Sequence, residues 1–346
     1  MLAAVLYARR DIRLENRPRP QWQSGMVLLR VRRAGICGSD LHYFEHGRCA
    51  AFVPTRPFVP GHELTGEVVA AADDVPTLKP GMRVTVNPTR PCGFCDYCKV
   101  GRINLCRRIT MLGSASTVPP TDGAFAEFIA VHADQCHALP PEISDGAGAL
   151  MEPFAVAWHA VKRAGCVGGK KILVLGGGPI GLLVALTARA FGAAPVALSE
   201  PAAARRQVAL KLGAEAALDP TTPDWPARTR QMAGDGFDFI FEASGSPSAF
   251  RLAFDFVRPG GTVVQIGTLG TADVPLPANL VMNREIQFIG SFRYGHVFDE
   301  AIQMVASGRV NLQPLVSDVF PLEKIADALC RAADQSRAIK VQIEIP

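Results

Sequence analysis

The spacing of hydrophobic and polar positions changes near residue 150 of this chain. Before that point, short apolar segments such as 26–31, 64–70 and 83–86 are separated by glycine and proline, which is typical of strands and tight turns. No helical periodicity of any length is visible before about Glu152. Many short strands with irregular loops predict a distorted, barrel-like β domain.

After residue 170, apolar strand patterns alternate with helical ones. Residues 170–175 predict a buried strand that runs into a glycine turn. Further strands are expected at 196–199, 237–243 and 262–267, and helices at 182–191, 202–212 and 248–257. Repeated βα units of this kind predict a parallel, doubly wound sheet. From about residue 290 the pattern is mixed again, with helices expected at 299–306 and 322–333 and a strand at 339–345.

The glycine turn carries a dinucleotide-binding motif. Gly176, Gly178 and Gly181 fit G-x-G-x-x-G, with Pro179 and Ile180 opening the helix, and the motif stands between a strand and a helix as it must. Glycine permits the tight turn and a close approach of the backbone to a pyrophosphate, while the N-terminus of the helix offers amide donors. These five residues are therefore predicted to bind a dinucleotide.

The next strand bears on which dinucleotide is bound. It ends in Glu200, at about the spacing of the acid that binds the ribose hydroxyls of adenosine. This carboxylate would repel a 2′-phosphate, so NAD is favoured over NADP. Arg205 and Arg206 follow closely and could soften that preference; the alternative is that they lie on the solvated face of the helix. NADP therefore stays possible.

Cysteine spacing predicts a closed metal site. Nine cysteines in a chain whose first residues favour a strand over a secretion signal point to metal ligands before disulfides. Cys92, Cys95, Cys98 and Cys106 form C-x2-C-x2-C-x7-C, and four thiolates on one loop can complete a tetrahedral zinc site without leaving a position for substrate. We expect a structural zinc here. The isolated cysteines are interpreted as buried or incidental thiols.

A second set of ligand-type residues comes from three separated segments. Cys37, the adjacent pair His62 and Glu63, and Glu152 together offer a thiolate, an imidazole and two carboxylates. Such a set can hold zinc with one position open, as a catalytic zinc requires. Each residue alone is better explained as a surface or packed side chain. Their occurrence together with the other motifs favours a catalytic zinc site.

Composition and charge exclude other classes of protein. The chain has 346 residues, enough for two domains, and 48% hydrophobic and 20% charged residues are ordinary for a globular protein. A net charge of +4 without a run of Lys and Arg disfavours a nucleic-acid partner. The uncharged run 172–188 is broken by glycine and proline, which favours a strand, a turn and a helix over a membrane span. We expect a cytoplasmic protein.

Taken in order, these features resemble a known enzyme family. The succession of Cys37, His62-Glu63, the four-cysteine array, Glu152 and the glycine turn is similar, over essentially the whole chain, to the zinc-dependent medium-chain alcohol and polyol dehydrogenases. The resemblance implies an α/β protein with a GroES-like, β-rich catalytic domain at 1–155 and 290–346. A Rossmann NAD-binding domain with a doubly wound parallel sheet would occupy 156–289. It also implies a homo-oligomer, a tetramer or dimer, formed through strands of that domain.

The resemblance extends to one branch of the family. Glu152 stands where the familiar alcohol dehydrogenases have a cysteine ligand, which resembles the sorbitol dehydrogenase branch, where glutamates complete or assist the zinc sphere, sometimes through water. Whether Glu63 or Glu152 binds zinc directly stays open. Stretches 35–43, 87–88, 113–115 and 290–293 resemble the members of the branch that oxidise the sugar acid L-idonate. Sorbitol or xylitol is the alternative substrate, and threonine a more distant one.

The family also implies roles for four further residues. Ser39 and His42 correspond to a proton relay towards solvent, although Ser39 could be a turn hydroxyl and His42 a surface histidine. Arg293 and Tyr294 correspond to a segment over the substrate. Arg293 could pair with a carboxylate, or it could bind only a polyol hydroxyl or ordered water. A non-catalytic dinucleotide-binding protein is the alternative from another class, and the complete ligand set argues against it.

Overall fold

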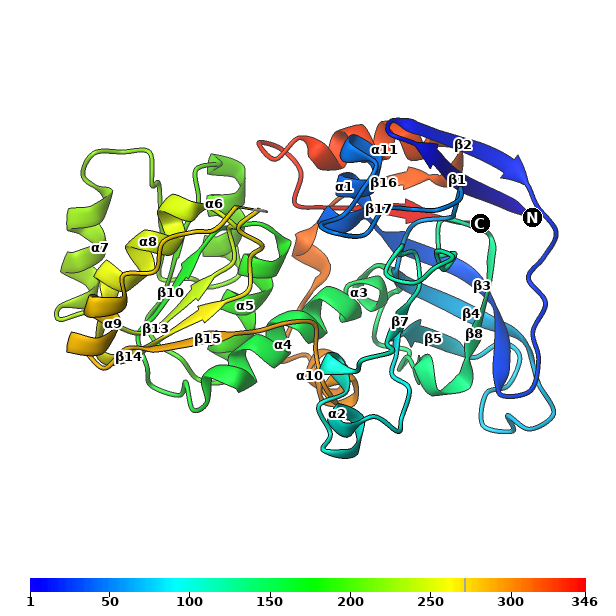
Figure 1. The fold of residues 1–346 in the computed structure, drawn as a ribbon, viewed down its shortest axis with the longest axis horizontal. Helices are drawn as coiled ribbons and strands as arrows, with labels where there is room; N and C mark the ends of the chain where they lie inside the picture. Colours follow the sequence, from blue (N-terminus) through cyan, green and yellow to red (C-terminus); the bar gives the residue numbers. More distant parts are fainter. Residues whose placement is uncertain (271) are drawn as a thin grey trace. The chain divides into compact units, whose positions relative to one another are not determined.

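The computed structural model describes residues 1–270 and 272–346, which divide into two compact units (Figure 1). Unit 1 comprises 1–152, 298–334 and 340–346, and unit 2 comprises 153–297 and 335–339. The chain therefore leaves the first unit twice, after residues 152 and 334, and returns to it each time, the second time for its last strand. Residues 290–297, expected with the catalytic domain, group with unit 2 in this division.

Unit 1 is built on an antiparallel sheet with one parallel pair at its edge. Its order is β16-β17-β3-β4-β5-β9, with β8 pairing β3, and β16 and β17 are parallel. The strands are β1 (Leu2–Ala8), β2 (Asp11–Asn16), β3 (Met26–Gly35), β4 (Glu63–Ala71), β5 (Arg83–Val86), β6 (Thr89–Arg90), β7 (Thr110–Met111), β8 (Phe128–His132), β9 (Cys136–Ala138), β16 (Val316–Pro321) and β17 (Lys340–Glu344). The helices are α1 (Gly38–His46), α2 (Asp96–Lys99), α3 (Asp145–Ala149), α10 (Phe298–Ala306) and α11 (Ile325–Ala333). Short 3-10 turns are η1 (Ile103–Leu105), η2 (Ala133–Gln135), η3 (Gln313–Leu315) and η4 (Leu322–Lys324).

The expectation of no helix before Glu152 is wrong, and α1 shows why. Its buried positions, Asp40, Tyr43 and Phe44, have the i, i+3, i+4 spacing of a helix face. One place in that stripe is taken by a carboxylate, so the hydrophobic pattern does not register it. Asp40 is tolerated there because its oxygens accept backbone N–H groups.

Unit 2 is a six-stranded parallel sheet of order β12-β11-β10-β13-β14-β15. The strands are β10 (Ile172–Leu175), β11 (Val196–Ser199), β12 (Ala216–Leu218), β13 (Phe237–Glu242), β14 (Val257–Gln265) and β15 (Gln287–Gly290). The helices are α4 (Met151–Ala164), which begins in unit 1, α5 (Pro179–Ala190), α6 (Ala203–Lys211), α7 (Trp225–Ala233), α8 (Pro247–Phe256) and α9 (Ala278–Asn283). The predicted alternation after residue 170 is present.

The strand order of unit 2 determines where a ligand can bind. Strands β10, β11 and β12 extend to one side, and β13, β14 and β15 extend to the other, so the order reverses between β10 and β13. Open parallel sheets bind ligands at such a switch point, outside the carboxyl ends of the strands. A buried aromatic cluster that includes Trp225, Phe237, Phe250, Phe254 and Phe256 packs α7 and α8 against this sheet.

Candidate metal centre and cofactor site

Three of the predicted zinc ligands converge in unit 1. The ligand atoms of Cys37, His62 and Glu63 all lie within 4.8 Å of one another. Strand pairing brings them together, because Gly35 at the end of β3 is the register partner of Glu63 at the start of β4, and Cys37 follows two residues later. His62 and Glu63 are buried, and Cys37 is half-buried. The segments that carry them are distant in sequence and adjacent in the sheet.

Two glycines leave the space that this arrangement needs. A Cβ on Gly35 would lie 2.1 Å from Oε2 of Glu63, so a side chain there would displace the carboxylate. Gly61 has φ +92°, and a Cβ on it would lie 2.7 Å from the ring of Phe125. Gly35 is therefore required because a side chain would clash with Glu63. Gly61 is required because a side chain would clash with Phe125 and because its backbone has a positive φ.

Asp40 supports the site and was not assigned a role from sequence. Its carboxylate accepts the backbone N–H of Cys37 at 2.9 Å and that of Gly61 at 3.1 Å. One of its oxygens lies 3.8 Å from Nδ1 of His62, which is buried and has no hydrogen-bond partner within residues 1–270 and 272–346. Ligating histidines are commonly oriented by such carboxylates. The capping-box position of Asp40, three residues after Cys37, was the available signal.

The charges around His62 favour a cation. Burial lowers the pKa of His62, but the negative charges of Cys37, Asp40 and Glu152 together raise that pKa well above its ordinary value. Burial raises the pKa of Asp40, and His62 opposes this shift. A thiolate, an imidazole and carboxylates are the donor types that bind zinc. The residues present therefore fit a zinc ion.

Glu63 has a partner that sequence analysis did not identify. Nζ of Lys340, the first residue of β17, lies 2.7 and 2.8 Å from the two carboxylate oxygens of Glu63 and 3.1 Å from the carbonyl oxygen of Ile36. Both side chains are buried. Burial lowers the pKa of Lys340, but Glu63, Cys37 and Glu152 outweigh it and raise that pKa. Glu63 is therefore charge-paired beside Cys37 and His62, the other two predicted ligands of this cluster.

Glu152, the fourth predicted ligand, lies in the first turn of helix α4. It is the second residue of α4 and is buried, and in the described part of the chain the cluster of close ligand atoms does not include it. Its negative charge nevertheless raises the pKa values of His62 and Lys340. It belongs to the same electrostatic environment, and its direct ligation stays a prediction.

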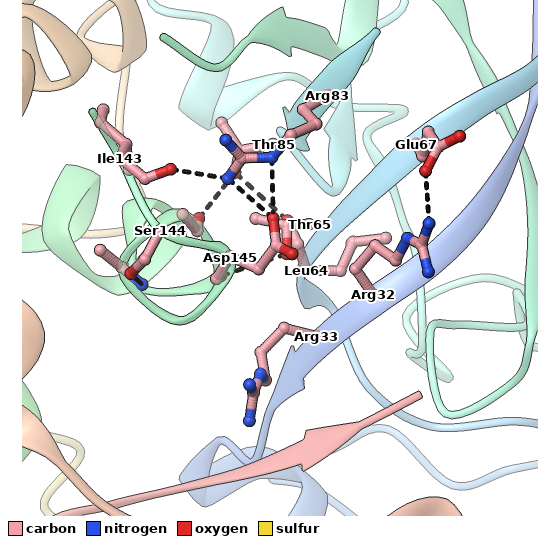
Figure 2. Close-up of polar contacts among 12 residues, drawn as sticks. Arg32, Arg33, Leu64, Thr65, Glu67, Arg83, Thr85, Ile143, Ser144 and Asp145 are labelled. Atoms are coloured by element: carbon pink, nitrogen blue, oxygen red, sulfur yellow. Dashed lines mark hydrogen bonds and ion pairs between the residues drawn. The ribbon is translucent and has the colours of Figure 1, made fainter. Parts of the chain in front are cut away.

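Helix α3, which leads into Glu152, is held by strands β4 and β5 (Figure 2). Arg83 donates to the carboxylate of Asp145 at 3.0 and 2.8 Å and to the carbonyl of Ile143 at 2.6 Å. The hydroxyl of Thr65 donates to the carbonyl of Asp145 at 3.1 Å, and that of Thr85 to the carbonyl of Gly148 at 2.9 Å. These bonds anchor the segment before Glu152 to the sheet that carries His62 and Glu63.

The four-cysteine array forms a compact second cluster. The Sγ atoms of Cys92, Cys95, Cys98 and Cys106 all lie within 4.8 Å of one another, and all four are free thiols. Backbone N–H groups point at the sulfurs, as from Cys92 and Arg108 to Cys106, and such groups lower the pKa of Cys95 to about 6. Amide donors stabilise thiolates, so the loop fits a tetrahedral zinc site.

The glycine turn of unit 2 is closely packed. Gly176 has φ +102°, and a Cβ on it would lie 2.8 Å from the backbone of Ser244. A Cβ on Gly181 would lie 1.9 Å from the carbonyl oxygen of Gly176. Gly178 precedes the first turn of α5, which contains Pro179 and Ile180. The turn therefore places the N-terminus of a helix at the carboxyl end of β10, as a pyrophosphate site requires.

Glu200 reaches this turn directly. Its carboxylate is buried and accepts the N–H of Gly177 at 2.7 Å and that of Ala202 at 2.9 Å. Arg205 is buried and donates to the carbonyl of Ala338 at 3.1 and 2.9 Å. Arg206 donates to the carbonyl of Glu200 at 2.8 Å. Neither arginine lies on a solvated face, and contact of Arg205 with a cofactor stays a prediction.

The remaining predicted residues have different environments. On α1, Ser39 is half-buried and His42 is exposed. Arg293 has a left-handed backbone, φ +51°, and its guanidinium lies 4.9 Å from the ring centre of exposed Phe292. Tyr294 is only 1% exposed. A non-glycine residue with positive φ costs free energy and is often found at functional sites.

His159, to which no sequence pattern assigned a role, contacts Gly295, the residue after Tyr294. Its Nδ1 accepts the N–H of Gly295 at 3.4 Å, within unit 2. Burial lowers the pKa of His159 to about 4, and the charges of Arg163 and Lys162 act in the same direction. A neutral imidazole is the form that can accept this hydrogen bond.

Of the helices in the described ranges, none is both long and apolar enough to cross a membrane.

Known proteins are similar to this chain in sequence and in fold. The family described as "Alcohol dehydrogenase GroES-like domain" matches residues 23–141, and the family described as "Zinc-binding dehydrogenase" matches residues 179–307. Sorbitol dehydrogenase of Bacillus subtilis is 36% identical over 345 residues, covering 99% of this chain and 97% of that protein. The structure of L-idonate 5-dehydrogenase from Escherichia coli is similar with a TM-score of 0.93 and 33% identity, covering 99% of this chain and 97% of that one.

A third similar protein was solved with a cofactor. A structure from Sinorhizobium meliloti, described as a zinc-binding dehydrogenase bound to NADP, has a TM-score of 0.91 and 32% identity, covering 99% of this chain and 98% of that one. The chain therefore belongs to the zinc-dependent medium-chain alcohol and polyol dehydrogenases. It is an oxidoreductase that uses zinc and a nicotinamide cofactor, and the predicted fold class is confirmed.

Proposed function

We propose that this enzyme oxidises L-idonate to 5-keto-D-gluconate with NAD. The observation that carries the proposal is Arg293, whose strained backbone presents a guanidinium in the segment 292–294. A guanidinium binds a carboxylate through two parallel hydrogen bonds, and a sugar acid has a carboxylate that a polyol lacks. Likeness to the L-idonate 5-dehydrogenase structure supports the same substrate class.

The roles proposed for the residues of this site follow from the donor atoms that they offer. When bound, zinc supplies a Lewis acid that lowers the pKa of a hydroxyl group, and the nicotinamide accepts the hydride. Cys37, His62 and Glu152 would hold the ion, with Glu63 as a fourth ligand or as a carboxylate that exchanges with water. Asp40 lies beside His62 and would support it, while Lys340 hydrogen-bonds both carboxylate oxygens of Glu63.

Proton release would use α1. Ser39 is half-buried two residues after Cys37, and His42 is exposed one turn further along α1. This succession from buried to exposed supports a relay that passes a proton outward. We expect His42→Ala to slow turnover most at low pH. An unchanged pH–rate profile would remove His42 from the relay.

NAD is proposed over NADP because Glu200 places a carboxylate against the glycine turn. Replacing Glu200 with alanine should raise the preference for NADP by about tenfold or more, since like-charge repulsion costs several kcal/mol. The Asp255→Ala variant, which removes an exposed acid of the same unit, serves as the control. Equal ratios of NAD to NADP activity in all three proteins would refute this role.

The alternative substrate is sorbitol or xylitol, which the sorbitol dehydrogenase relative favours. The deciding experiment is NADH oxidation by the purified enzyme with 5-keto-D-gluconate and, in parallel, with fructose. A strong preference for the keto acid supports the proposal. A preference for fructose would reassign the enzyme to the sorbitol dehydrogenases, with zinc and cofactor unchanged.

We also propose that the protein is a homo-oligomer. The edge strand β15 and the exposed side chains Leu276, Met282 and Phe288 support a dimer or tetramer formed through unit 2. Sedimentation of the Phe288→Glu variant as a monomer would agree, and an unchanged assembly would not.

Nine free thiols support a location in the cytoplasm. Fractionation that places the protein outside the cytoplasm would refute it.

A further inference from the structure

The side-chain amide of Gln265, the last residue of β14, has a defined orientation. Its Nε2 lies 2.7 Å from Oε2 of Glu242 and 2.6 Å from the carbonyl oxygen of Gly267. A carboxylate and a carbonyl only accept hydrogen bonds, so the amide nitrogen must be the atom that faces them. The carbonyl oxygen, Oε1, therefore faces away from both.

Glu242 is what holds this orientation. Its fully buried carboxylate also accepts the N–H groups of Ser244 at 2.8 Å and Gly245 at 3.0 Å. The same acid thereby fixes both the loop after β13 and the side chain that ends β14. Glu242 is a positioning residue for Gln265.

The other polar atom of the Gln265 amide, Oε1, is buried. Across residues 1–270 and 272–346, Oε1 is buried and has no hydrogen-bond partner, and the same holds for the hydroxyl of Ser291. Buried polar atoms are nearly always paired because leaving one unpaired costs free energy. Each of these two atoms, on residues joined by a backbone hydrogen bond, is a position where a ligand can supply the missing bond.

These two residues are neighbours at the edge of the sheet where ligands bind. Gln265 and Gly290 are register partners in the parallel pair β14–β15, and the N–H of Ser291 donates to the backbone carbonyl of Gln265 at 2.8 Å. Gln265 is the last residue of β14, and Ser291 follows Gly290, the last residue of β15. Strands β14 and β15 are neighbours in the half of the sheet that begins at β13 (Figure 1). That edge is where a dinucleotide lies in such sheets.

We propose that Oε1 of Gln265 and the hydroxyl of Ser291 bind the carboxamide group of the nicotinamide. A carboxamide offers N–H donors, which Gln265 Oε1 can accept, and a carbonyl oxygen, to which the Ser291 hydroxyl can donate. A ribose hydroxyl is the other donor that a dinucleotide could present here. The inference requires the nicotinamide cofactor and is independent of which alcohol is oxidised.

The test measures binding to the zinc-loaded enzyme by calorimetry without an alcohol substrate. The ligands are NAD, its 3-acetylpyridine analogue, in which a methyl group replaces the amide nitrogen, and ADP-ribose, which lacks the nicotinamide. The proteins are wild type, Gln265→Met, Ser291→Ala and the control Gln287→Met, which changes an exposed glutamine on β15. Thermal unfolding of each variant shows whether it is folded.

We expect Gln265→Met and Ser291→Ala each to weaken NAD binding about tenfold, equivalent to about 1.4 kcal/mol, and to leave ADP-ribose binding unchanged. The acetylpyridine analogue should bind wild type more weakly than NAD does. The affinity of the analogue for Gln265→Met should equal its affinity for wild type, because the analogue lacks the N–H groups that Gln265 would accept. Its affinity for Ser291→Ala should still be lower, because it keeps the carbonyl oxygen to which Ser291 would donate. The control should match wild type.

Two results would overturn the proposal. Unchanged NAD binding in the variants would mean that neither atom contacts the cofactor. Equal weakening of NAD and ADP-ribose would assign the atoms to the ribose instead of the carboxamide. If Gln265→Met does not fold, Ser291→Ala decides the question, because it removes only one oxygen. A failed assay on L-idonate has no bearing on any of these measurements.

Discussion

Lys340 and Glu63 are 277 residues apart in sequence, and Nζ of Lys340 lies 2.7 and 2.8 Å from the two carboxylate oxygens of Glu63. The pair is fully buried and lies beside Cys37 and His62. It ties β17, near the end of the chain, to β4, which follows His62, a predicted metal ligand. A positive charge is thereby placed among acidic groups that are expected to hold zinc.

Breaking this pair should destabilise the protein strongly. Lys340→Met leaves a buried carboxylate uncompensated, which typically costs about 3–5 kcal/mol. The double variant Lys340→Met/Glu63→Leu should lose less than the sum of the single variants, because no charge is left buried alone. Urea unfolding measures all three, with exposed Lys324→Met as the control. Additive losses would show that the two residues do not act as a pair.

The four-cysteine loop should hold a zinc that is independent of catalysis. Cys98→Ser removes one of four ligands, so the metal content should fall from about two zinc ions per chain to about one. The melting temperature should fall with it, because structural zinc contributes folding energy. Metal analysis and thermal unfolding measure these changes, and exposed Cys166→Ser is the control. Retention of both ions in Cys98→Ser would argue against the predicted site.

His159 should make stability depend on pH below neutrality. The unfolded histidine takes up a proton near pH 6.5, whereas burial lowers the pKa of the folded one to about 4. The unfolded state therefore binds more protons between these values, and stability falls as pH drops from about 6.5 to about 4. His159→Gln keeps an acceptor for Gly295 and does not titrate. Urea unfolding at several pH values should show a shallower loss for this variant; parallel curves would contradict the assignment.

Arg293 should discriminate between acidic and neutral substrates. Arg293→Ala is expected to lose far more kcat/KM on an aldonate than on an uncharged polyol, by about tenfold or more, because hydrogen bonds to charged groups contribute about 1.5–3 kcal/mol. Arg251→Ala removes an exposed arginine of the same unit and provides the control. Similar losses on both substrates would leave Arg293 with only a hydroxyl or water to bind.

Local motifs could be interpreted from sequence because their parts are close along the chain. Cys92, Cys95, Cys98 and Cys106 occupy one loop, so spacing alone places their sulfurs together. The same holds for the glycine turn, where Gly176, Gly178 and Gly181 stand between one strand and one helix. In both cases a few backbone angles determine the geometry.

The supporting residues required the tertiary structure. Asp40 contacts Gly61 from 21 residues away, Lys340 reaches Glu63 across 277, and Gln265 meets Glu242 through a parallel pair whose register no local pattern specifies. Helix α1 was missed because a buried carboxylate occupies its apolar face. The amino-acid sequence by itself determined the family, the paired βα units and the thiol cluster. Strand pairing between distant segments decided which polar side chains are buried together, since burial and partner choice depend on register and not on neighbours in the chain.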